Sequence, residues 1–214
     1  MRIQSTHHHA DRGLDPYFTP TEAVTSVLHL EEEHLPSRIW EPAAGNGAIV
    51  RPFAAAGYQV IASDVADYGL DDCRIGVDYL SAPAEPDVQG IVTNPPYRLA
   101  VAFAEKALQE VAYLALLLRT NFLESTARLP FFRKHPPARI WISSRRLPMM
   151  HRHGWQGPEA PSNTCYAWFI WDAQASQKRM VDWFDWKQEI AKGPPMCLAR
   201  PPGIGLGSGS AVAA

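Results

Sequence analysis

The 214-residue chain lacks several features that would assign it to a particular class of protein. Its three cysteines, Cys73, Cys165 and Cys197, form no C-x-x-C pair, which argues against a disulfide framework or a zinc ribbon and fits a reducing compartment. No apolar run approaches the roughly 18 residues that a membrane span requires. The N-terminus also has no apolar segment of the kind found in signal peptides. We therefore expect a cytoplasmic protein that does not associate with membranes.

Both ends of the chain have little capacity to form a packed core. Residues 1–15 are polar and include His7, His8 and His9, which without a carboxylate or thiol partner make a poor metal site. Residues 193–214 are rich in Gly, Pro, Ser and Ala. We expect a flexible tail at 1–15, a disordered tail at 193–214, a single domain over 16–190, and no bound metal.

Within 16–190, helical and extended patterns alternate. This alternation predicts an α/β fold with a mostly parallel sheet and helices on both faces. The expected strands are 38–41, 58–63, 90–93, 113–119, 138–143 and 166–171, and the expected helices are 19–35, 47–56, 99–111 and 122–134. Ligands bind to such sheets at the carboxyl ends of the strands.

Three polar motifs follow predicted strands, and the first two suit a small ligand. The loop Glu41-Pro42-Ala43-Ala44-Gly45-Asn46-Gly47 carries an acid ahead of two glycines, which suits a ligand with an ammonium group better than a pyrophosphate. Asp64 ends the next strand and can accept hydrogen bonds from ribose hydroxyls. Asp78 can accept one from an adenine amino group. Taken singly, the loop also fits a plain turn, and each acid fits a helix cap or a loop position.

The third motif, Asn94-Pro95-Pro96-Tyr97, points to chemistry on an exocyclic amine. Such an amine is a weak nucleophile because its lone pair is delocalised into the ring. The Asn94 side-chain oxygen and the Pro95 carbonyl, held by consecutive prolines, can accept from its two N–H bonds and favour a pyramidal nitrogen. Tyr97 supplies a face on which a planar base can stack. A simple Asn-Pro-Pro turn is the bland alternative.

With these motifs in place, residues 16–172 resemble the Rossmann-like amino-methyltransferases, above all the DNA adenine-N6 methyltransferases with an Asn-Pro-Pro-Tyr motif. The motif order is similar to the gamma arrangement, and the compact length resembles small phage and prophage members. The resemblance implies S-adenosylmethionine as cofactor and a class I methyltransferase fold. Its seven-stranded, mostly parallel sheet would have an antiparallel last strand, placed at 165–171. The implied cofactor-binding residues are Tyr17, Phe18, Thr19, Pro20, Glu41, Ala43, Gly45, Asn46, Gly47, Asp64, Asp78 and Asn94.

Although the formal net charge is only −2, one segment is strongly basic. Residues 125–158 contain no Asp or Glu, and a local excess of cations on a near-neutral protein is typical of a phosphate-binding face. The basic residues of the segment are Arg128, Arg133, Lys134, Arg139, Arg145, Arg146 and Arg152. The long connection 145–164 is predicted to contact DNA through Arg145, Arg146 and Arg152, with Trp155 as a stacking or wedge residue. The alternatives are a solvated face for the arginines and an anchoring role for Trp155.

Two departures from the family pattern limit the interpretation. Larger members carry a target-recognition domain after the catalytic core, whereas only residues 172–214 follow here, so short or relaxed sequence specificity is expected. No Pro-Cys dipeptide is present, which disfavours cytosine-C5 methylation. Methylation of RNA adenine, of cytosine N4 or of a protein glutamine amide stays open, as does a nucleic-acid-binding protein with a decayed cofactor site. The sequence does not predict an oligomeric state.

Overall fold

The computed structural model describes residues 19–149, 164–176 and 178–195, and the predicted tails lie largely outside these ranges. Their centre is one eight-stranded sheet with the order β3-β2-β1-β4-β5-β7-β6-β8. The strands are β1 (Arg38–Glu41), β2 (Gln59–Asp64), β3 (Arg74–Ile75), β4 (Gly90–Thr93), β5 (Tyr113–Arg119), β6 (Arg139–Ser143), β7 (Tyr166–Asp172) and β8 (Met180–Phe184).

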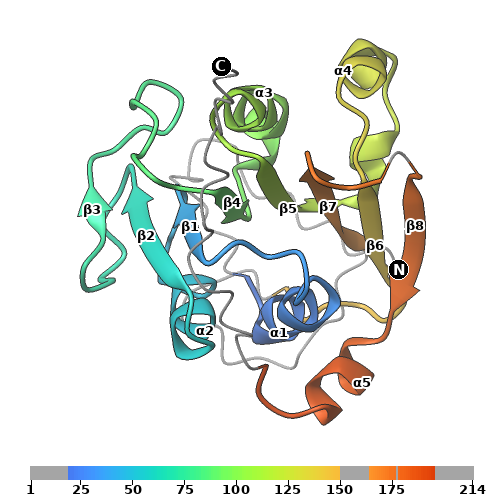
Figure 1. Ribbon diagram of the computed structural model, residues 1–214, viewed down its shortest axis with the longest axis horizontal. Coiled ribbons are helices and arrows are strands. Elements are labelled where there is room, and N and C mark those ends of the chain that lie inside the picture. The colour runs from blue at the N-terminus through green and yellow to red at the C-terminus, as the bar shows by residue number, and fades with distance from the viewer. Residues whose placement is uncertain (1–18, 150–163, 177, 196–214) are drawn as a thin grey trace, which may run out of the picture.

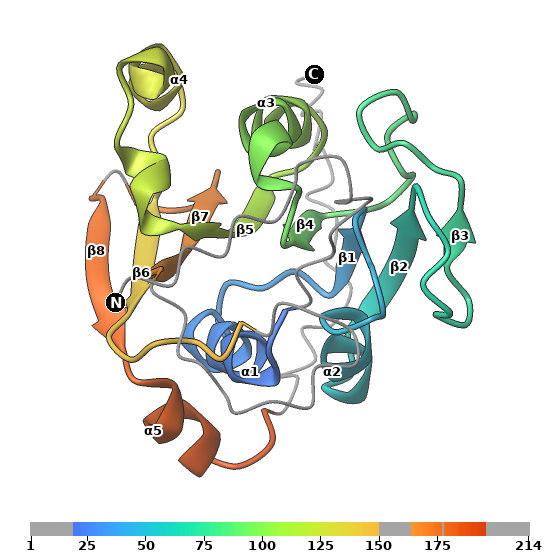
Figure 2. The same ribbon diagram turned by 180° about the vertical axis from the view of Figure 1, so that it is seen from behind.

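Helices cover both faces of this sheet, as predicted. Figures 1 and 2 show α1, α2 and α5 on one side and α3 and α4 on the other. The α-helices are α1 (Thr21–Leu30), α2 (Val50–Ala55), α3 (Ala100–Glu110), α4 (Leu129–Lys134) and α5 (Trp186–Ala191), and the 3-10 helices are η2 (Tyr97–Leu99), η3 (Thr120–Leu123) and η4 (Thr126–Arg128). The predicted α/β class is therefore confirmed.

Strand β7 runs antiparallel to both of its neighbours, β5 and β6, whereas the other pairings in the described sheet are parallel. The antiparallel strand predicted at 165–171 is confirmed. The prediction of seven strands with the antiparallel one last is wrong, because β8 follows β7 and adds an eighth strand parallel to β6. Only Phe184 of β8 is buried, so this edge strand lacks the alternating pattern that marks a half-buried strand.

Two predicted helices differ from the observed ones. The helix expected to reach Leu35 ends at Leu30. The single helix expected over 122–134 is divided into η3, η4 and α4. Ser125 is extended and its hydroxyl accepts from the Ala127 N–H at 3.1 Å, so it begins a new 3-10 turn. Pro130 lies in the first turn of α4, where its missing N–H costs nothing.

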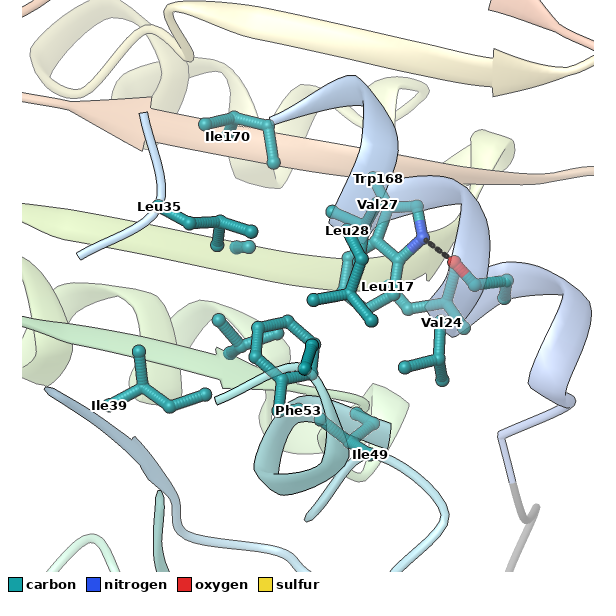
Figure 3. Close-up of a cluster of buried hydrophobic side chains, with 14 of the residues drawn as sticks. Val24, Val27, Leu28, Leu35, Ile39, Ile49, Phe53, Leu117, Trp168 and Ile170 are labelled. Carbon is teal, nitrogen blue, oxygen red and sulfur yellow. Dashed lines mark hydrogen bonds between the residues drawn. The ribbon is translucent and has the colours of Figure 1, made fainter. Parts of the chain in front are cut away.

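The core consists of two apolar layers, one on each face of the sheet. Figure 3 shows the layer between the sheet and the helices α1 and α2, where Val27, Leu28 and Phe53 pack against Leu117 and Trp168. The indole N–H of Trp168 donates to the Ala23 carbonyl at 2.9 Å, which satisfies its one buried polar group. This layer fixes α1 against β5 and β7.

A buried ionic network lies away from the carboxyl ends of the parallel strands. The Arg139 guanidinium donates to Glu31, with Nη2–Oε2 at 2.7 Å, and to Asp172 at 2.8 Å. Glu31 also accepts from the Trp141 indole and the Tyr113 hydroxyl. Arg139 belongs to the basic segment 125–158, but its pairing and burial leave it no role on a phosphate-binding surface.

Candidate active site

A cavity of about 390 Å³ opens at the edge of the sheet where β1, β2 and β4 end. Because these strands are parallel, the loops that follow them converge there. Its lining residues are Thr19, Glu41, Pro42, Ala43, Ala44, Gly45, Asn46, Ala48, Ile49, Asp64, Val65, Tyr68, Val77, Asp78, Tyr79, Asn94, Pro95, Pro96, Tyr97, Leu99 and Phe103. The three motifs singled out in the sequence therefore share one cavity.

The loop after β1 is held by backbone bonds that require its glycines. Gly45 and Gly47 have φ values of 51° and 81°, a conformation that favours glycine. The Gly47 N–H donates to the Ala44 carbonyl at 2.8 Å, and the Ala44 N–H donates to the Ser63 carbonyl at 3.0 Å. A Cβ at Gly47 would lie 2.5 Å from Cδ1 of Leu70. The loop is thus folded tightly against β2 and its following turn.

Asp64 lies at the end of β2 and joins the two loops. Its carboxylate accepts from the Gly45 N–H at 2.8 Å and from the Ala66 N–H at 3.0 Å. The side chain is buried and lines the cavity. Each carboxylate oxygen has two acceptor sites, so these bonds leave room for a ligand hydroxyl. Asp78 also lines the cavity; it is exposed and accepts from the Leu80 N–H at 3.1 Å.

Glu41 is almost completely buried at the end of β1. Burial raises the pKa of Glu41 to about 8; the Thr93 hydroxyl and the Ala43 N–H act to lower it, and the nearby Asp64 charge raises it further. The Ala43 N–H donates to Oε1 of Glu41 at 3.0 Å. A buried carboxyl that is mostly protonated near neutral pH is suited to a cationic partner, which would favour its ionised form.

The motif after β4 forms the opposite wall of the cavity. Asn94, Pro95, Pro96 and Tyr97 all line it. Pro96 has φ −54° and ψ 118°, and its carbonyl accepts from the Leu99 N–H at 2.8 Å, which begins η2. The Pro96 carbonyl is thus used within the turn. The half-buried ring of Tyr97 packs against both apolar layers of the core.

A few predicted residues fall outside the cavity. Pro20 and Gly47 do not line it. Pro20 lies just before α1, and Gly47 packs closely against Leu70. Tyr17 and Phe18 lie outside the described residues.

Sequence reasoning missed several lining residues. The main ones are apolar or aromatic: Val65, Tyr68, Tyr79, Leu99 and Phe103. Val65 directly follows Asp64, and Leu99 comes two residues after Tyr97. Both are large apolar side chains that the fold leaves exposed, and this exposure is visible only in the structure. The tyrosine ring of Tyr79 is fixed by its hydroxyl, which donates to Glu110 on α3 at 3.0 Å.

The predicted nucleic-acid contacts are only partly described. Arg145 is exposed but forms a two-bond ion pair with Asp185, with Nε–Oδ1 at 2.9 Å and Nη2–Oδ2 at 2.7 Å. Exposed Arg146 places Nη1 3.0 Å from the sulfur of Cys165. Arg152 and Trp155 lie outside the described residues. Arg128 donates to the backbone carbonyls of residues 121, 122 and 124 and therefore stabilises the turns around η3.

No group of three or more metal-ligating side chains occurs within the described ranges, and no helix there is long and apolar enough to cross a membrane. No protein-family model matches the chain, and no curated protein does so either. Solved structures do match.

A modification subunit assigned to a type I restriction enzyme from Vibrio vulnificus is 12% identical over 80% of this chain and 46% of its own, with a TM-score of 0.54. A protein from Listeria monocytogenes assigned as a class I S-adenosylmethionine-dependent methyltransferase is 14% identical, over 85% and 71%, with a TM-score of 0.56. A protein from Pyrococcus horikoshii assigned as an RNA methyltransferase is 14% identical, over 73% and 87%, with a TM-score of 0.55.

These likenesses establish that the chain has the Rossmann-like class I methyltransferase fold. The chain spans less than half the length of the Vibrio vulnificus subunit.

Proposed function

We propose that the protein transfers a methyl group from S-adenosylmethionine to the exocyclic N6 amine of adenine in DNA. The proposal rests on one observation above all. The acid-and-glycine loop after β1, Asp64 at the end of β2 and the motif Asn94-Pro95-Pro96-Tyr97 line a single cavity.

The residues present fit the proposed cofactor. The cavity of about 390 Å³ is within the usual size range of small-molecule sites. Glu41, Asp64 and Asp78 supply carboxylates for an ammonium group, ribose hydroxyls and an adenine amino group, respectively. The Asn46 side-chain oxygen is buried with no hydrogen-bond partner among the described residues, so a ligand donor there would satisfy it.

When bound, S-adenosylmethionine would supply an electrophilic methyl group. The chain's own contribution is to orient the amine. The Asn94 side-chain oxygen and the Pro95 carbonyl each accept a hydrogen bond from one N–H of the amine, which directs the nitrogen lone pair out of the base ring. Tyr97 stacks on the base. A strong general base is unnecessary, because the nitrogen releases its proton after it has become a cation.

The choice of DNA adenine rests on the residues rather than on the fold. Asn at position 94 favours adenine over cytosine N4, and the motif order is similar to that of DNA methyltransferases. The matched structures include a modification subunit assigned to a restriction enzyme and a protein assigned as an RNA methyltransferase, so the fold is compatible with either nucleic acid. RNA is therefore the substrate to test beside DNA.

The test is methyl transfer from radiolabelled S-adenosylmethionine to unmethylated DNA, with RNA and a protein extract in parallel. We expect label in DNA as N6-methyladenine and a loss of about 10²-fold or more in kcat for Asn94→Ala, because one of two oriented acceptors is removed. Asn121→Ala is the matched control, since Asn121 is exposed on η3 and does not line the cavity. It should retain wild-type activity.

The other outcomes separate the parts of the proposal. Label only in RNA or only in protein would keep the amine chemistry and overturn the DNA substrate. Binding of S-adenosylmethionine without transfer to any of the three would overturn the enzymatic role. Equal activity of Asn94→Ala and the wild type would overturn the role of the motif.

A further inference from the structure

Tyr97 has a cationic neighbour on its ring. The Arg119 guanidinium carbon lies over the Tyr97 ring, 4.7 Å from its centroid. This distance is within the range of a cation–π contact, in which the positive charge is attracted to the negative ring face. Arg119 does not contribute to the lining of the cavity, whereas Tyr97 does. Tyr97 thus lies between the cavity, which it lines, and a cation that does not line it.

The position of Arg119 follows from the strand pairing. It is the last residue of β5 and lies directly opposite Tyr166, the first residue of β7. Just beyond it, the Thr120 N–H donates to the Cys165 carbonyl at 2.9 Å, which continues the strand pairing past the end of β5. The backbone that carries Arg119 is thus held by β7, whereas the pairing of β5 with β4 ends at Leu116.

Tyr166 completes the support. Its ring centroid is 6.2 Å from that of Tyr97, with the planes inclined at 45°, so the two rings are in contact range. Tyr166 is buried in the apolar layer beneath α1. Tyr97 is consequently bounded by Arg119 over one ring face and by Tyr166 beside it. Few orientations remain for its ring.

From this arrangement we infer that Arg119 is a positioning residue, which holds the Tyr97 ring so that its cavity side presents a fixed stacking surface to the target base. The inference rests on the proposed function in assigning base stacking to Tyr97. Arg119 acts through Tyr97, since it does not line the cavity. The ring would be ordered before substrate arrives, so binding would not incur the cost of ordering it.

The chemistry favours arginine at this position over lysine. A planar guanidinium can lie parallel to a ring and restrict its rotation, whereas an ammonium acts as a point charge on a flexible stem. Arg119→Lys should therefore keep the attraction and lose part of the orientation. Arg119→Met keeps much of the length and apolar volume, and it removes the charge.

The first test uses steady-state kinetics with the full chain. For Arg119→Met we expect kcat/KM for DNA to fall by about 10- to 100-fold, since small misplacements of reacting groups carry penalties of this size. The Kd for S-adenosylmethionine should change less than twofold. Arg119→Lys should be intermediate. Arg38→Met is the control. Arg38 is a half-buried arginine at the first position of β1, so it lies at the amino end of its strand, whereas Arg119 lies at the carboxyl end of β5.

The second test needs neither cofactor nor substrate. A single 3-fluorotyrosine at position 97 would report the ring by 19F NMR. We expect Arg119→Met to shift and narrow the signal, because the ring loses its cation and reorients more freely, and Arg119→Lys to restore part of the wild-type shift. Arg38→Met should leave the spectrum unchanged. Thermal unfolding of each variant separates these effects from general destabilisation.

The outcomes distinguish the two proposals. An unchanged 19F signal in Arg119→Met would overturn the inference, whatever the substrate proves to be. A changed signal with unchanged kcat/KM would also overturn it, because the orientation would not matter to the base. If the wild type transfers no methyl group to any amine, the proposed function fails. In that case, the 19F result alone decides whether Arg119 orients Tyr97.

Discussion

At the scale of single residues, the protonation of Glu41 has a measurable consequence for stability. The pKa of Glu41 is raised from its ordinary 4.5 to about 8 in the folded protein. The folded chain therefore binds one more proton at this site than the unfolded chain between those two values. The resulting stabilisation is fully present below about pH 4.5 and is lost as the pH rises through 8.

We predict that Glu41→Gln removes this pH dependence. Between pH 5.5 and 7.5, the wild-type free energy of unfolding should carry a contribution from this group that falls by up to about 1.4 kcal/mol per pH unit, and the variant should lack it. Gln still provides an oxygen for the Ala43 N–H. Urea unfolding of both proteins across this range is the measurement. Parallel curves would show that Glu41 ionises normally in the folded state.

The same ionisation should govern cofactor affinity. Because a bound ammonium group favours the charged carboxylate, wild-type affinity for S-adenosylmethionine should increase with pH up to about 8 and then level off. Glu41→Gln should bind more weakly above pH 8 and show little dependence below it. Isothermal titration at three pH values tests this part of the prediction.

At the scale of elements, the loop after β1 and the loop after β2 each contain a glycine, Gly47 and Gly69, that can be compared. Gly47 and Gly69 both have positive φ values, 81° and 72°. A Cβ at Gly69 would meet no atom within 4 Å, whereas one at Gly47 would lie 2.5 Å from Leu70 Cδ1. Alanine at Gly69 therefore tests backbone strain alone. Alanine at Gly47 adds the contact with Leu70 and a milder one, at 3.2 Å, with the flexible end of the Arg51 side chain.

We predict that Gly69→Ala lowers the free energy of unfolding by about 1 kcal/mol through backbone strain. Gly47→Ala should lower it further, by about another 1 kcal/mol for displacing Leu70, and should weaken cofactor binding. In a Leu70→Ala background the two glycine variants should become equal. Denaturant unfolding of the six proteins, the two backgrounds and both glycine variants in each, measures this. An equal effect of the two glycine variants in the native background would exclude the contact with Leu70.

The comparison of sequence with structure is clearest for elements with strong local patterns. The loop after β1, Asp64 and the motif after β4 line one cavity, which the sequence predicts because parallel strands bring successive strand ends together. The prediction of one helix over 122–134 was wrong, because capping by Ser125 begins a new turn within a continuous apolar pattern. Arg139 was misplaced because its partners, Glu31 and Asp172, are 108 and 33 residues away in the chain. No local pattern carries such a pairing.

At the scale of the whole molecule, the unpredicted elements β8 and α5 alter the view of the basic segment. Helix α5 packs against α1, with His29 Nδ1 3.7 Å from Glu189 Oε2. The Trp186 indole donates to the Arg146 carbonyl at 3.1 Å, and Asp185 pairs with Arg145. The segment that begins the connection to β7 is therefore attached to the C-terminal elements. A phosphate that binds Arg145 has to compete with Asp185.

This competition gives a prediction for DNA binding. If Arg145 contacts a phosphate, Asp185→Asn should strengthen binding, because it removes the competing charge while an Asn side chain can still accept from the Lys187 N–H. Arg145→Ala should weaken binding and reduce the slope of log K against log salt by about 1. Fluorescence anisotropy with duplex DNA from 50 to 200 mM salt provides both the binding constant and its dependence on salt.

The control for this prediction is Asp182→Asn, which removes an exposed acid on β8 that does not pair with Arg145. A gain confined to Asp185→Asn, and abolished when Arg145→Ala is added, would assign the effect to the released guanidinium. Equal gains from both aspartate variants would reduce it to a change in net charge. Arg145 would then serve mainly to attach α5 to the sheet, and the phosphate contacts would have to come from other residues of the segment.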